Sequence, residues 1–187
     1  MKYNLLLIRH GETDWNREKR LQGITDNPLN ENGEKYAWLV LEKILEAKEK
    51  PIAIYSSPLI RARQTAEIFS DQLEIPIIYN DDLKEVNCGT LEGLTWNDIK
   101  KMTGKDIEPL YEAFQFDYTP YGGESIQQLR VRMKNFEEFL NSKTESFVQT
   151  FIVISHGTFI KLFLKEKTGK HFEGDFVWPV TYFPIEI

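Results

Sequence analysis

Two of the three histidines in the chain follow apolar runs and stand beside a glycine. Leu5-Leu6-Leu7-Ile8 leads into Arg9-His10-Gly11-Glu12-Thr13, and Phe151-Ile152-Val153-Ile154 leads into Ser155-His156-Gly157-Thr158. Apolar runs of this length are typical of buried parallel strands, and α/β enzymes gather reactive groups where such strands end. An imidazole there can act as a nucleophile or a proton carrier. The spacing therefore predicts that two imidazoles meet at one sheet edge.

A cationic motif, Ser57-Pro58-Leu59-Ile60-Arg61, follows another short apolar run. We expect Ser57 to cap a helix and Pro58 to occupy its first turn, which puts Arg61 near the positive end of that helix. A fixed cation beside free backbone donors suits a phosphate. An acidic segment, Asp81–Gly89, follows the next expected strand. Residues far apart in the sequence are thus predicted to converge on the carboxyl edge of one sheet.

Short apolar runs alternate with longer amphipathic segments, which is the pattern of a parallel sheet covered by helices on both faces. The expected strands are Tyr3–Ile8, Ile52–Ser56, Pro76–Tyr79, Phe151–Ser155 and about Tyr182–Ile187. Helical spacing of apolar residues marks three helix faces, namely Ala37, Val40, Leu41 and Ile44, then Ala62, Ala66, Phe69 and Leu73, then Ile126, Leu129, Met133, Phe136 and Leu140. Pro184 lacks a backbone donor, so we place the last strand at an edge.

The composition predicts one domain, because 187 residues with 41% apolar content are enough for a full core. A net charge of −6 argues against nucleic acid and against an anionic membrane as partners. Cys88 is the only cysteine, so no internal disulfide is expected. We find no secretory leader and no apolar stretch long enough to span a bilayer. We therefore expect a soluble, cytoplasmic protein, and the oligomeric state stays open, a homodimer included.

Taken together, these motifs resemble the histidine phosphatase superfamily, branch 1, the phosphoglycerate-mutase-like proteins. The matching segments are Arg9–Thr13 with Asn16 and Arg20–Gly23, Asp26–Gly33, Ser57–Ala66, Leu83–Gly93, Gly122–Ser125 and Ser155–Gly157. An Arg-His-Gly tripeptide alone is a weak signal, but ordered motifs on compatible elements make chance convergence very improbable. The resemblance implies a three-layer α/β sandwich with a mostly parallel sheet, helices on both faces and a small helical insertion near the active site.

The resemblance also implies the chemistry. His10 would attack phosphorus and become a phosphohistidine, which divides one hydrolysis into two displacements. Arg9 and Arg61 would grip the phosphoryl oxygens, with His156 as a further donor, and their charges would lower the pKa of His10. Glu85 would serve as general acid and then as general base. Neither a metal nor a cofactor is implied. Whether burial raises the pKa of Glu85 against the pull of the arginines stays open.

Supporting positions in the phosphate pocket are implied for Asn16, Gln22, Gly23 and the backbone amide of Gly157. Glu85 has acidic neighbours that a solvated loop would also contain, namely Asp81, Asp82 and Glu92. Its spacing to Gly89 and to Leu91-Glu92-Gly93 favours Glu85 as the acid.

Several other side chains have a plainer interpretation. Cys88 has no evident base beside it, which favours a small buried thiol over a nucleophile. His171 matches no motif and is interpreted as a surface residue. The cations Arg17, Lys19 and Arg20 are interpreted as mostly solvated, with attraction of a phosphorylated substrate as the alternative.

Residues 95–125 lie between the acidic segment and the next long helix, within a single domain expected to span residues 1–187. They carry Trp96, Tyr111, Phe114, Phe116, Tyr118 and Tyr121. These rings could form a lid or specificity segment that stacks on an apolar or ring-bearing leaving group. They could equally pack a small helical subdomain, and the sequence leaves both readings open.

We expect a metal-independent phosphomonoesterase that acts on a small phosphorylated metabolite. The compact length and the stretch Arg20–Gly33 look most like the α-ribazole phosphatase type, with broad specificity as a further option. Phosphoglycerate mutase is the alternative within the family. Mutases usually carry Arg-His-Tyr-Gly after the acid and a longer insertion, whereas this chain has Val86-Asn87-Cys88-Gly89. A silent phosphate-binding module is the alternative from another class, and the proton donor Glu85 argues against it.

Overall fold

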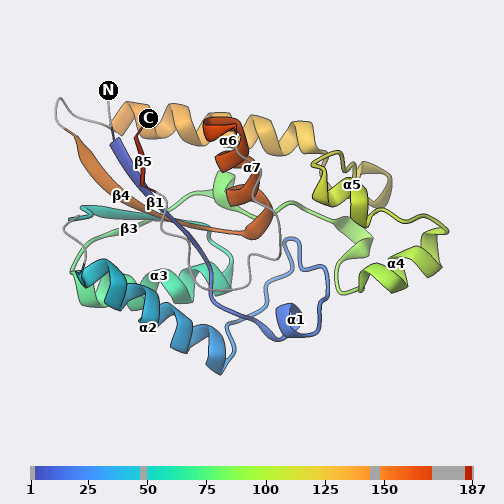
Figure 1. Ribbon diagram of the computed structural model, residues 1–187, viewed down its shortest axis with the longest axis horizontal. Coiled ribbons are helices and arrows are strands. Elements are labelled where there is room, and N and C mark those ends of the chain that lie inside the picture. The colour runs from blue at the N-terminus through green and yellow to red at the C-terminus, as the bar shows by residue number, and fades with distance from the viewer. Residues whose placement is uncertain (1–2, 47–49, 144–147, 170–183, 187) are drawn as a thin grey trace.

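The computed structural model describes residues 3–46, 50–143, 148–169 and 184–186 (Figure 1). Within these ranges five strands form one sheet in the order β3-β2-β4-β1-β5. The strands are β1 (Tyr3–Arg9), β2 (Ala53–Ser56), β3 (Ile77–Tyr79), β4 (Gln149–Ser155) and β5 (Pro184–Glu186). The first four run parallel, and β5 pairs antiparallel with β1 at the end of the sheet. The predicted edge position of the last strand is confirmed.

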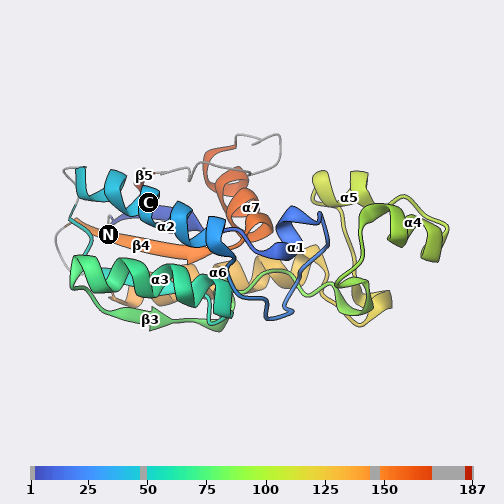
Figure 2. The same ribbon diagram turned by 90° about the horizontal axis from the view of Figure 1, so that it is seen from below.

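Helices cover both faces of the sheet. They are α1 (Asp14–Arg17), α2 (Glu31–Glu46), α3 (Ile60–Leu73), α4 (Trp96–Thr103), α5 (Glu108–Glu112), α6 (Ile126–Lys143) and α7 (Gly157–Thr168), with short 3-10 helices η1 (Asp81–Leu83), η2 (Gly89–Leu91) and η3 (Thr119–Tyr121). Figures 1 and 2 show α2 and α3 on one face and α6 and α7 on the other. This arrangement confirms the predicted three-layer α/β sandwich.

Each face of the sheet has its own buried cluster. Successive side chains of a strand point to opposite faces, so Leu5 and Leu7 of β1 join the cluster under α6 and α7. Leu6 and Ile8 join the cluster under α2 and α3. Because both faces are buried, the strands are continuous apolar runs rather than alternating ones. None of the helices in the described ranges is both long and apolar enough to cross a membrane.

Two glycines allow the loop after β1 to pass directly against the first turn of α2. A Cβ atom on Gly11 would collide with the Gly33 carbonyl, and one on Gly33 would collide with the backbone of Glu12. The Asn30 amide donates to the Glu12 carbonyl at 2.9 Å across the same contact. This packing fixes the course of the chain that carries His10. Helices α4 and α5 lie beyond the end of the sheet where the parallel strands finish (Figure 2).

Candidate active site

The motifs that follow β1 and β4 meet, as their sequences predict. The two strands are neighbours with Arg9 opposite Ser155, and the His10 amide donates to the Ser155 carbonyl at 3.0 Å. The His10 and His156 rings therefore lie 5.0 Å apart between centroids. Both imidazoles are buried, with exposed fractions of 3% and 0%.

The hydrogen bonds of the His10 ring determine which of its two nitrogens carries the proton and which carries the lone pair. Its Nδ1 lies 2.7 Å from the Gly11 carbonyl oxygen, which can only accept, so the ring proton sits on Nδ1. Nε2 then carries the lone pair and accepts from Arg61 Nε at 3.2 Å. Burial lowers the pKa of His10 well below its usual value, and the charges of Arg61 and Arg9 lower it further. A neutral imidazole whose Nε2 carries a lone pair rather than a proton is the state that a nucleophile requires.

Arg61 is fully buried and holds a neighbouring loop as well as His10. Its two terminal nitrogens donate to the carbonyls of Gly23 at 2.7 Å and Thr25 at 2.8 Å. Burial lowers the pKa of Arg61 to about 10, while Glu85 and Asp26 act in the opposite direction. The guanidinium therefore stays charged at neutral pH beside the His10 nitrogen.

The prediction that Ser57 caps the helix carrying Arg61 is wrong. Helix α3 begins at Ile60, two residues later than expected, and its N-cap residue Leu59 makes no side-chain cap. The Ile60 amide is instead satisfied by Asp26 Oδ1, at 2.5 Å, from a loop far away in the sequence. Ser57 Oγ lies 2.8 Å from His156 Nε2. Arg61 still lies in the first turn of α3, so its predicted place near the positive end holds.

His156 has one ring nitrogen bound to Ser57, whereas its second ring nitrogen is unpaired within the part of the chain that the structure describes. Ser57 Oγ accepts from the Leu59 amide at 3.3 Å, so its own proton can be donated to His156 Nε2. The other ring nitrogen, Nδ1, is buried and has no hydrogen-bond partner among the described residues. Burial, followed by the charge of Arg61, lowers the pKa of His156 well below its usual value. In the tautomer that carries its proton on Nδ1, this nitrogen can donate to a ligand oxygen.

Of the four acidic residues weighed in the loop after β3, Glu85 is the one that lines the cavity. Its Oε2 accepts from the Thr158 amide at 3.2 Å in the first turn of α7, and its Oε1 accepts from Val86 at 2.9 Å. Asp81 lies on the surface and pairs with Lys84 at 2.9 Å. Asp82 lies in the same 3-10 turn, η1. The geometry therefore favours Glu85 over these neighbours as the proton donor.

Glu92, which the sequence left as a solvated alternative, instead clamps two loops together. Its carboxylate accepts from the amides of Ile24 at 3.0 Å, Thr25 at 2.9 Å and Cys88 at 3.0 Å, and from the Thr25 hydroxyl. The Thr25 carbonyl is one of the two that hold Arg61. Glu92 thus joins the loop that grips Arg61 to the loop that carries Glu85.

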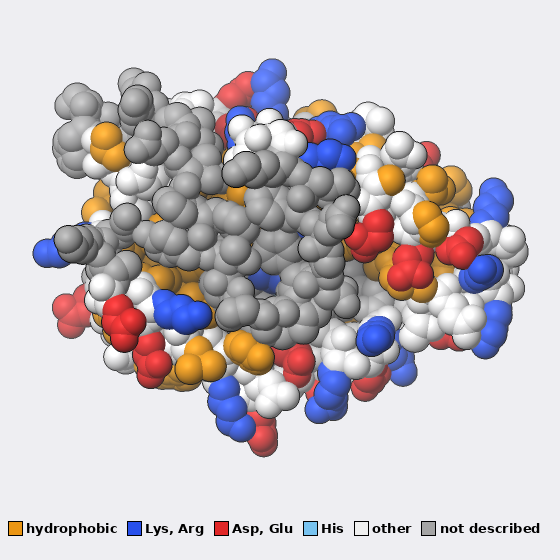
Figure 3. Space-filling view, viewed as in Figure 1, with side chains coloured by type: hydrophobic (Ala, Val, Ile, Leu, Met, Phe, Trp, Pro, Cys, Tyr) orange, Lys and Arg blue, Asp and Glu red, His pale blue; other side chains and the backbone are white. Residues whose placement is uncertain are grey.

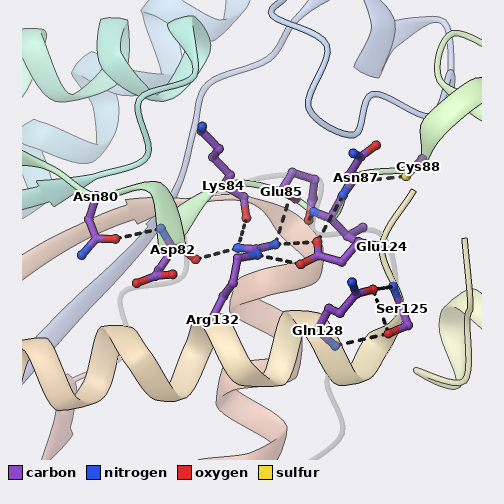
Figure 4. A network of polar contacts seen from close by, with 11 residues as sticks. Asn80, Asp82, Lys84, Glu85, Asn87, Cys88, Glu124, Ser125, Gln128 and Arg132 are labelled. Atoms are coloured by element: carbon purple, nitrogen blue, oxygen red, sulfur yellow. Dashed lines mark hydrogen bonds and ion pairs between the residues drawn. The ribbon is translucent and has the colours of Figure 1, made fainter. Parts of the chain in front are cut away.

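A second network, which the sequence did not reveal, fixes the backbone around Glu85 (Figure 4). Arg132 of α6 donates to the carbonyls of Asp82 at 2.6 Å, Lys84 at 3.0 Å and Glu85 at 3.4 Å. It also forms a two-pronged ion pair with Glu124, at 2.7 and 2.8 Å. A bidentate pair of this kind is the strongest form of charged hydrogen bond. Arg132 was missed because its partners are mainly backbone carbonyls, which leave no pattern in the sequence.

These side chains surround a cavity of about 820 Å³. All predicted pocket residues except the deeper His156 line it, namely Arg9, His10, Asn16, Gln22, Gly23, Arg61, Glu85 and Gly157. The Asn16 amide oxygen is used in a capping box with Thr13. Gln22 Oε1 is buried without a partner among the described residues. The Gly23 carbonyl holds Arg61, so it supports the arginine that faces His10.

The structure tests the predictions made for Cys88 and for the cations Arg17 and Arg20. Cys88 is buried, as predicted, and burial together with the Glu85 charge raises the pKa of its thiol. Arg17 and Arg20 form exposed ion pairs with Asp14 and Glu18, both at 2.8 Å, while both arginines also border the cavity. His171 lies outside the described residues.

The aromatic residues of the 95–125 segment divide between two roles. Phe114, Phe116 and Tyr118 are buried in the core cluster, whereas Trp96 and Tyr111 line the cavity with ring centroids 5.2 Å apart. The packing role is confirmed for Phe114, Phe116 and Tyr118, and the role of the segment as a lid that stacks on a leaving group stays a prediction.

A neutral imidazole, two arginines and a carboxylate at the carboxyl edge of a parallel sheet define a class of α/β enzyme that handles phosphate. Residues 5–182 match the family model of the histidine phosphatase superfamily (branch 1). The chain therefore belongs to the histidine phosphatase superfamily, branch 1.

Individual relatives agree with this assignment. A metal-independent phosphoserine phosphatase of Arabidopsis thaliana is 40% identical over 159 residues, which are 82% of this chain and 63% of that protein. The chain thus spans less than two thirds of that relative. Phosphoglycerate mutase-like protein 4 of the same plant is 32% identical over 84% of this chain and 67% of its own length. The solved structure of Bacillus stearothermophilus YhfR superposes with a TM-score of 0.74 at 31% identity, covering 90% of this chain and 81% of YhfR. The phosphatase names support a phosphoric monoester hydrolase.

Proposed function

We propose that this protein is a metal-independent phosphomonoesterase that works through a phosphohistidine at His10. The observation that carries the proposal is the state of His10, whose Nε2 lone pair is free of a proton and faces the Arg61 guanidinium at 3.2 Å. Two further groups support it: Glu85 lines the same cavity as His10, and the His156 ring, whose Nδ1 is buried without a partner among the described residues, lies 5.0 Å from the His10 ring.

The reaction would proceed in two displacements. His10 Nε2 forms a bond to phosphorus while the bond from phosphorus to the ester oxygen breaks, and Glu85 gives its proton to that oxygen. Arg9, Arg61 and His156 Nδ1 stabilise the charge that builds on the phosphoryl oxygens. Water then attacks the phosphohistidine, Glu85 takes a proton from it, and phosphate leaves His10 in its starting state.

The substrate would be a small phosphorylated metabolite. The relatives named phosphoserine phosphatase make phosphoserine a candidate beside α-ribazole phosphate. Asn16, Gln22, Gly23 and Gly157 would border the bound phosphate in a single domain. Residues 95–125 would form a lid or specificity segment. We further propose a cytoplasmic location, with the homodimer left open.

Phosphate release tests this proposal. The wild type and His10→Ala are compared in EDTA on p-nitrophenyl phosphate, phosphoserine, α-ribazole phosphate, sugar phosphates and 3-phosphoglycerate. We expect turnover that persists in EDTA and that the variant loses. Equal turnover by His10→Ala would refute the nucleophile, and loss of turnover in EDTA that added divalent metal restores would refute metal independence.

Phosphoglycerate mutase is the second candidate, because relatives named mutase also match the chain. It predicts interconversion of 2- and 3-phosphoglycerate, in the presence of a bisphosphate primer, at a rate well above hydrolysis. That result would replace the phosphatase assignment. Silence in both assays would favour a phosphate-binding module.

A further inference from the structure

Glu92 differs from the exposed carboxylates of the protein in what surrounds its oxygens. Acidic side chains are spread over the face shown in Figure 3, several of them beside basic ones. The Glu92 carboxylate instead accepts from the amides of Ile24, Thr25 and Cys88, at 2.9 to 3.0 Å, and from the Thr25 hydroxyl. Charge-assisted hydrogen bonds of this kind are stronger than neutral ones. Glu92 therefore joins two loops firmly.

The backbone around this contact is fixed by hydrogen bonds of its own. Glu92 ends the 3-10 turn η2. The Gly93 amide donates to the Leu21 carbonyl at 2.8 Å, and the Leu21 amide donates to the Leu94 carbonyl at 2.9 Å. Leu21 leads directly into the loop of residues 22–25. The segment that carries Glu92 is thus fastened to the start of the loop that its carboxylate binds.

One peptide unit connects Glu92 to Arg61. The N–H of the peptide between Gly23 and Ile24 donates to Glu92 Oε1 at 3.0 Å, and the C=O of the same peptide accepts from Arg61 at 2.7 Å. The amide dipole therefore points its positive end at the carboxylate and its negative end at the guanidinium. Hydrogen bonds linked in this way polarise and strengthen one another. A side chain at position 23 would collide with the Glu92 carboxylate, so the contact depends on the glycine.

Arg61 is a buried cation whose counter-charge is supplied indirectly. Among the described residues its hydrogen bonds go to uncharged groups, one imidazole nitrogen and two carbonyls. Burial lowers the pKa of Arg61, and the charges of Glu85, Asp26 and Glu92 oppose that effect. Glu92 acts through the peptide unit, so it occupies no N–H of the guanidinium. A guanidinium has five N–H groups, and these contacts use three of them, which leaves N–H groups for phosphoryl oxygens.

We propose that Glu92 is a positioning residue for Arg61, which it holds at the phosphoryl site through the peptide unit between Gly23 and Ile24. Glu92 is not among the residues that line the cavity, so it acts without touching the phosphoryl group. Without its carboxylate the loop of residues 22–25 would lose the hydrogen bonds that fix it. Arg61, whose terminal nitrogens are bound to that loop, would then move away from the nucleophile. This inference rests on the proposed phosphatase function.

Affinity for inorganic phosphate reports on Arg61 without a leaving group. We expect Glu92→Gln to weaken phosphate binding by roughly 10-fold, because a displaced charged donor loses its hydrogen bond. The value of kcat/KM should fall by roughly 10- to 100-fold, and by the same factor for p-nitrophenyl phosphate and phosphoserine, since both present the same phosphoryl group. Titration calorimetry and steady-state kinetics provide the measurements. Glu67→Gln is the matched control on α3, because it removes only an exposed pair with Arg63 at 3.8 Å, and it should leave both values unchanged.

A milder variant and a spectroscopic readout separate positioning from a general loss of stability. Thr25→Val removes the hydroxyl that donates to Glu92. It should weaken phosphate binding by roughly 2- to 10-fold, the range of a single hydrogen bond, so the test holds even if Glu92→Gln does not fold. The Arg61 Nε–H, which His10 accepts at 3.2 Å, is followed by NMR of arginine-labelled protein. Its hydrogen exchange should be slow in the wild type and in Glu67→Gln and roughly 10-fold faster in Glu92→Gln.

The two proposals fail in different ways. If hydrolysis depends on His10 but Glu92→Gln and Thr25→Val bind phosphate and hydrolyse esters like the wild type, the positioning role is refuted and the phosphatase stands. Slower hydrolysis with unchanged phosphate affinity and unchanged Arg61 exchange also refutes the positioning role. A wild type that binds phosphate without hydrolysing any ester refutes the phosphatase, and the phosphate affinities of the variants still decide the role of Glu92. A wild type that does neither refutes both.

Discussion

His10 and His156 are two imidazoles that the folded protein keeps uncharged. Burial is the larger cause of their lowered pKa values, and Arg61 and Arg9 add to it. In the unfolded chain both histidines take up a proton near pH 6.5. The unfolded state therefore binds more protons than the folded state at mildly acidic pH, so acid favours unfolding in that range. The burial that keeps His10 uncharged, as its proposed role as nucleophile requires, thus costs stability at low pH.

This cost can be measured as the pH dependence of the free energy of unfolding. Stability should be fully retained above pH 6.5 and should fall as the pH drops below it, by up to about 1.4 kcal/mol per pH unit for each histidine. His10→Gln and His156→Gln should each flatten the dependence between about pH 5.5 and 6.5, where most carboxylates stay ionised. Chemical denaturation at a series of pH values provides the measurement. Identical slopes in wild type and both variants would show that neither imidazole is held neutral.

At the scale of elements, the loop that carries Glu85 has little regular structure of its own. It consists of the short 3-10 turns η1 and η2, and residues 84–88 between them belong to no helix or strand. Arg132 of α6 fixes the backbone of this loop, because it donates hydrogen bonds to the carbonyls of Asp82, Lys84 and Glu85. The side chain of Arg132 is 20% exposed, and that of its partner Glu124 is 13% exposed. We therefore assign Arg132 as a positioning residue for Glu85.

A comparison of two arginines on α6 tests this role. Arg132→Met should lower kcat for alkyl phosphates by roughly 10- to 100-fold, because a misplaced acid loses much of its effect. The loss should be smaller for p-nitrophenyl phosphate, whose leaving group departs without a proton. Arg130→Met is the control, since Arg130 forms an exposed ion pair with Glu166 at 2.7 Å and such pairs contribute little. Equal losses on both kinds of substrate would indicate general damage to the fold.

The sequence predicted those site residues that directly follow a recognisable strand pattern. Apolar runs located the strands, and the residues directly after them, such as His10 and His156, follow from that placement. The sequence did not predict hydrogen bonds between residues that lie far apart in the chain. At the start of α3, Asp26 rather than Ser57 accepts the hydrogen bond from the Ile60 amide. Glu92 and Arg132 form hydrogen bonds with backbone groups of other loops. Helix α7 was not predicted; its residues 157–164 are all buried, and a helix that is buried all round lacks the exposed polar face that marks a surface helix.

At the scale of the whole molecule, two parts of the fold contribute to the cavity: the sheet with its following helices, and the segment of residues 95–125. The parallel strands and the helices that follow them deliver His10, Arg61 and His156 from rigid elements to one edge of the sheet. Residues of the 95–125 segment, Trp96 and Tyr111 among them, line the same cavity, and their proposed role is to contact the leaving group. A change in that segment can alter the choice of substrate while the phosphoryl centre is kept.

Direct detection of the phosphoenzyme tests the central claim most sharply. Wild type, Glu85→Gln and His10→Ala are mixed with p-nitrophenyl phosphate, quenched in alkali, and analysed by intact mass and peptide mapping. We expect one phosphoryl group on His10, enriched in Glu85→Gln because the attacking water loses its base, and no phosphoryl group in His10→Ala. A phosphoryl group on any other residue, or its persistence in His10→Ala, would contradict the mechanism.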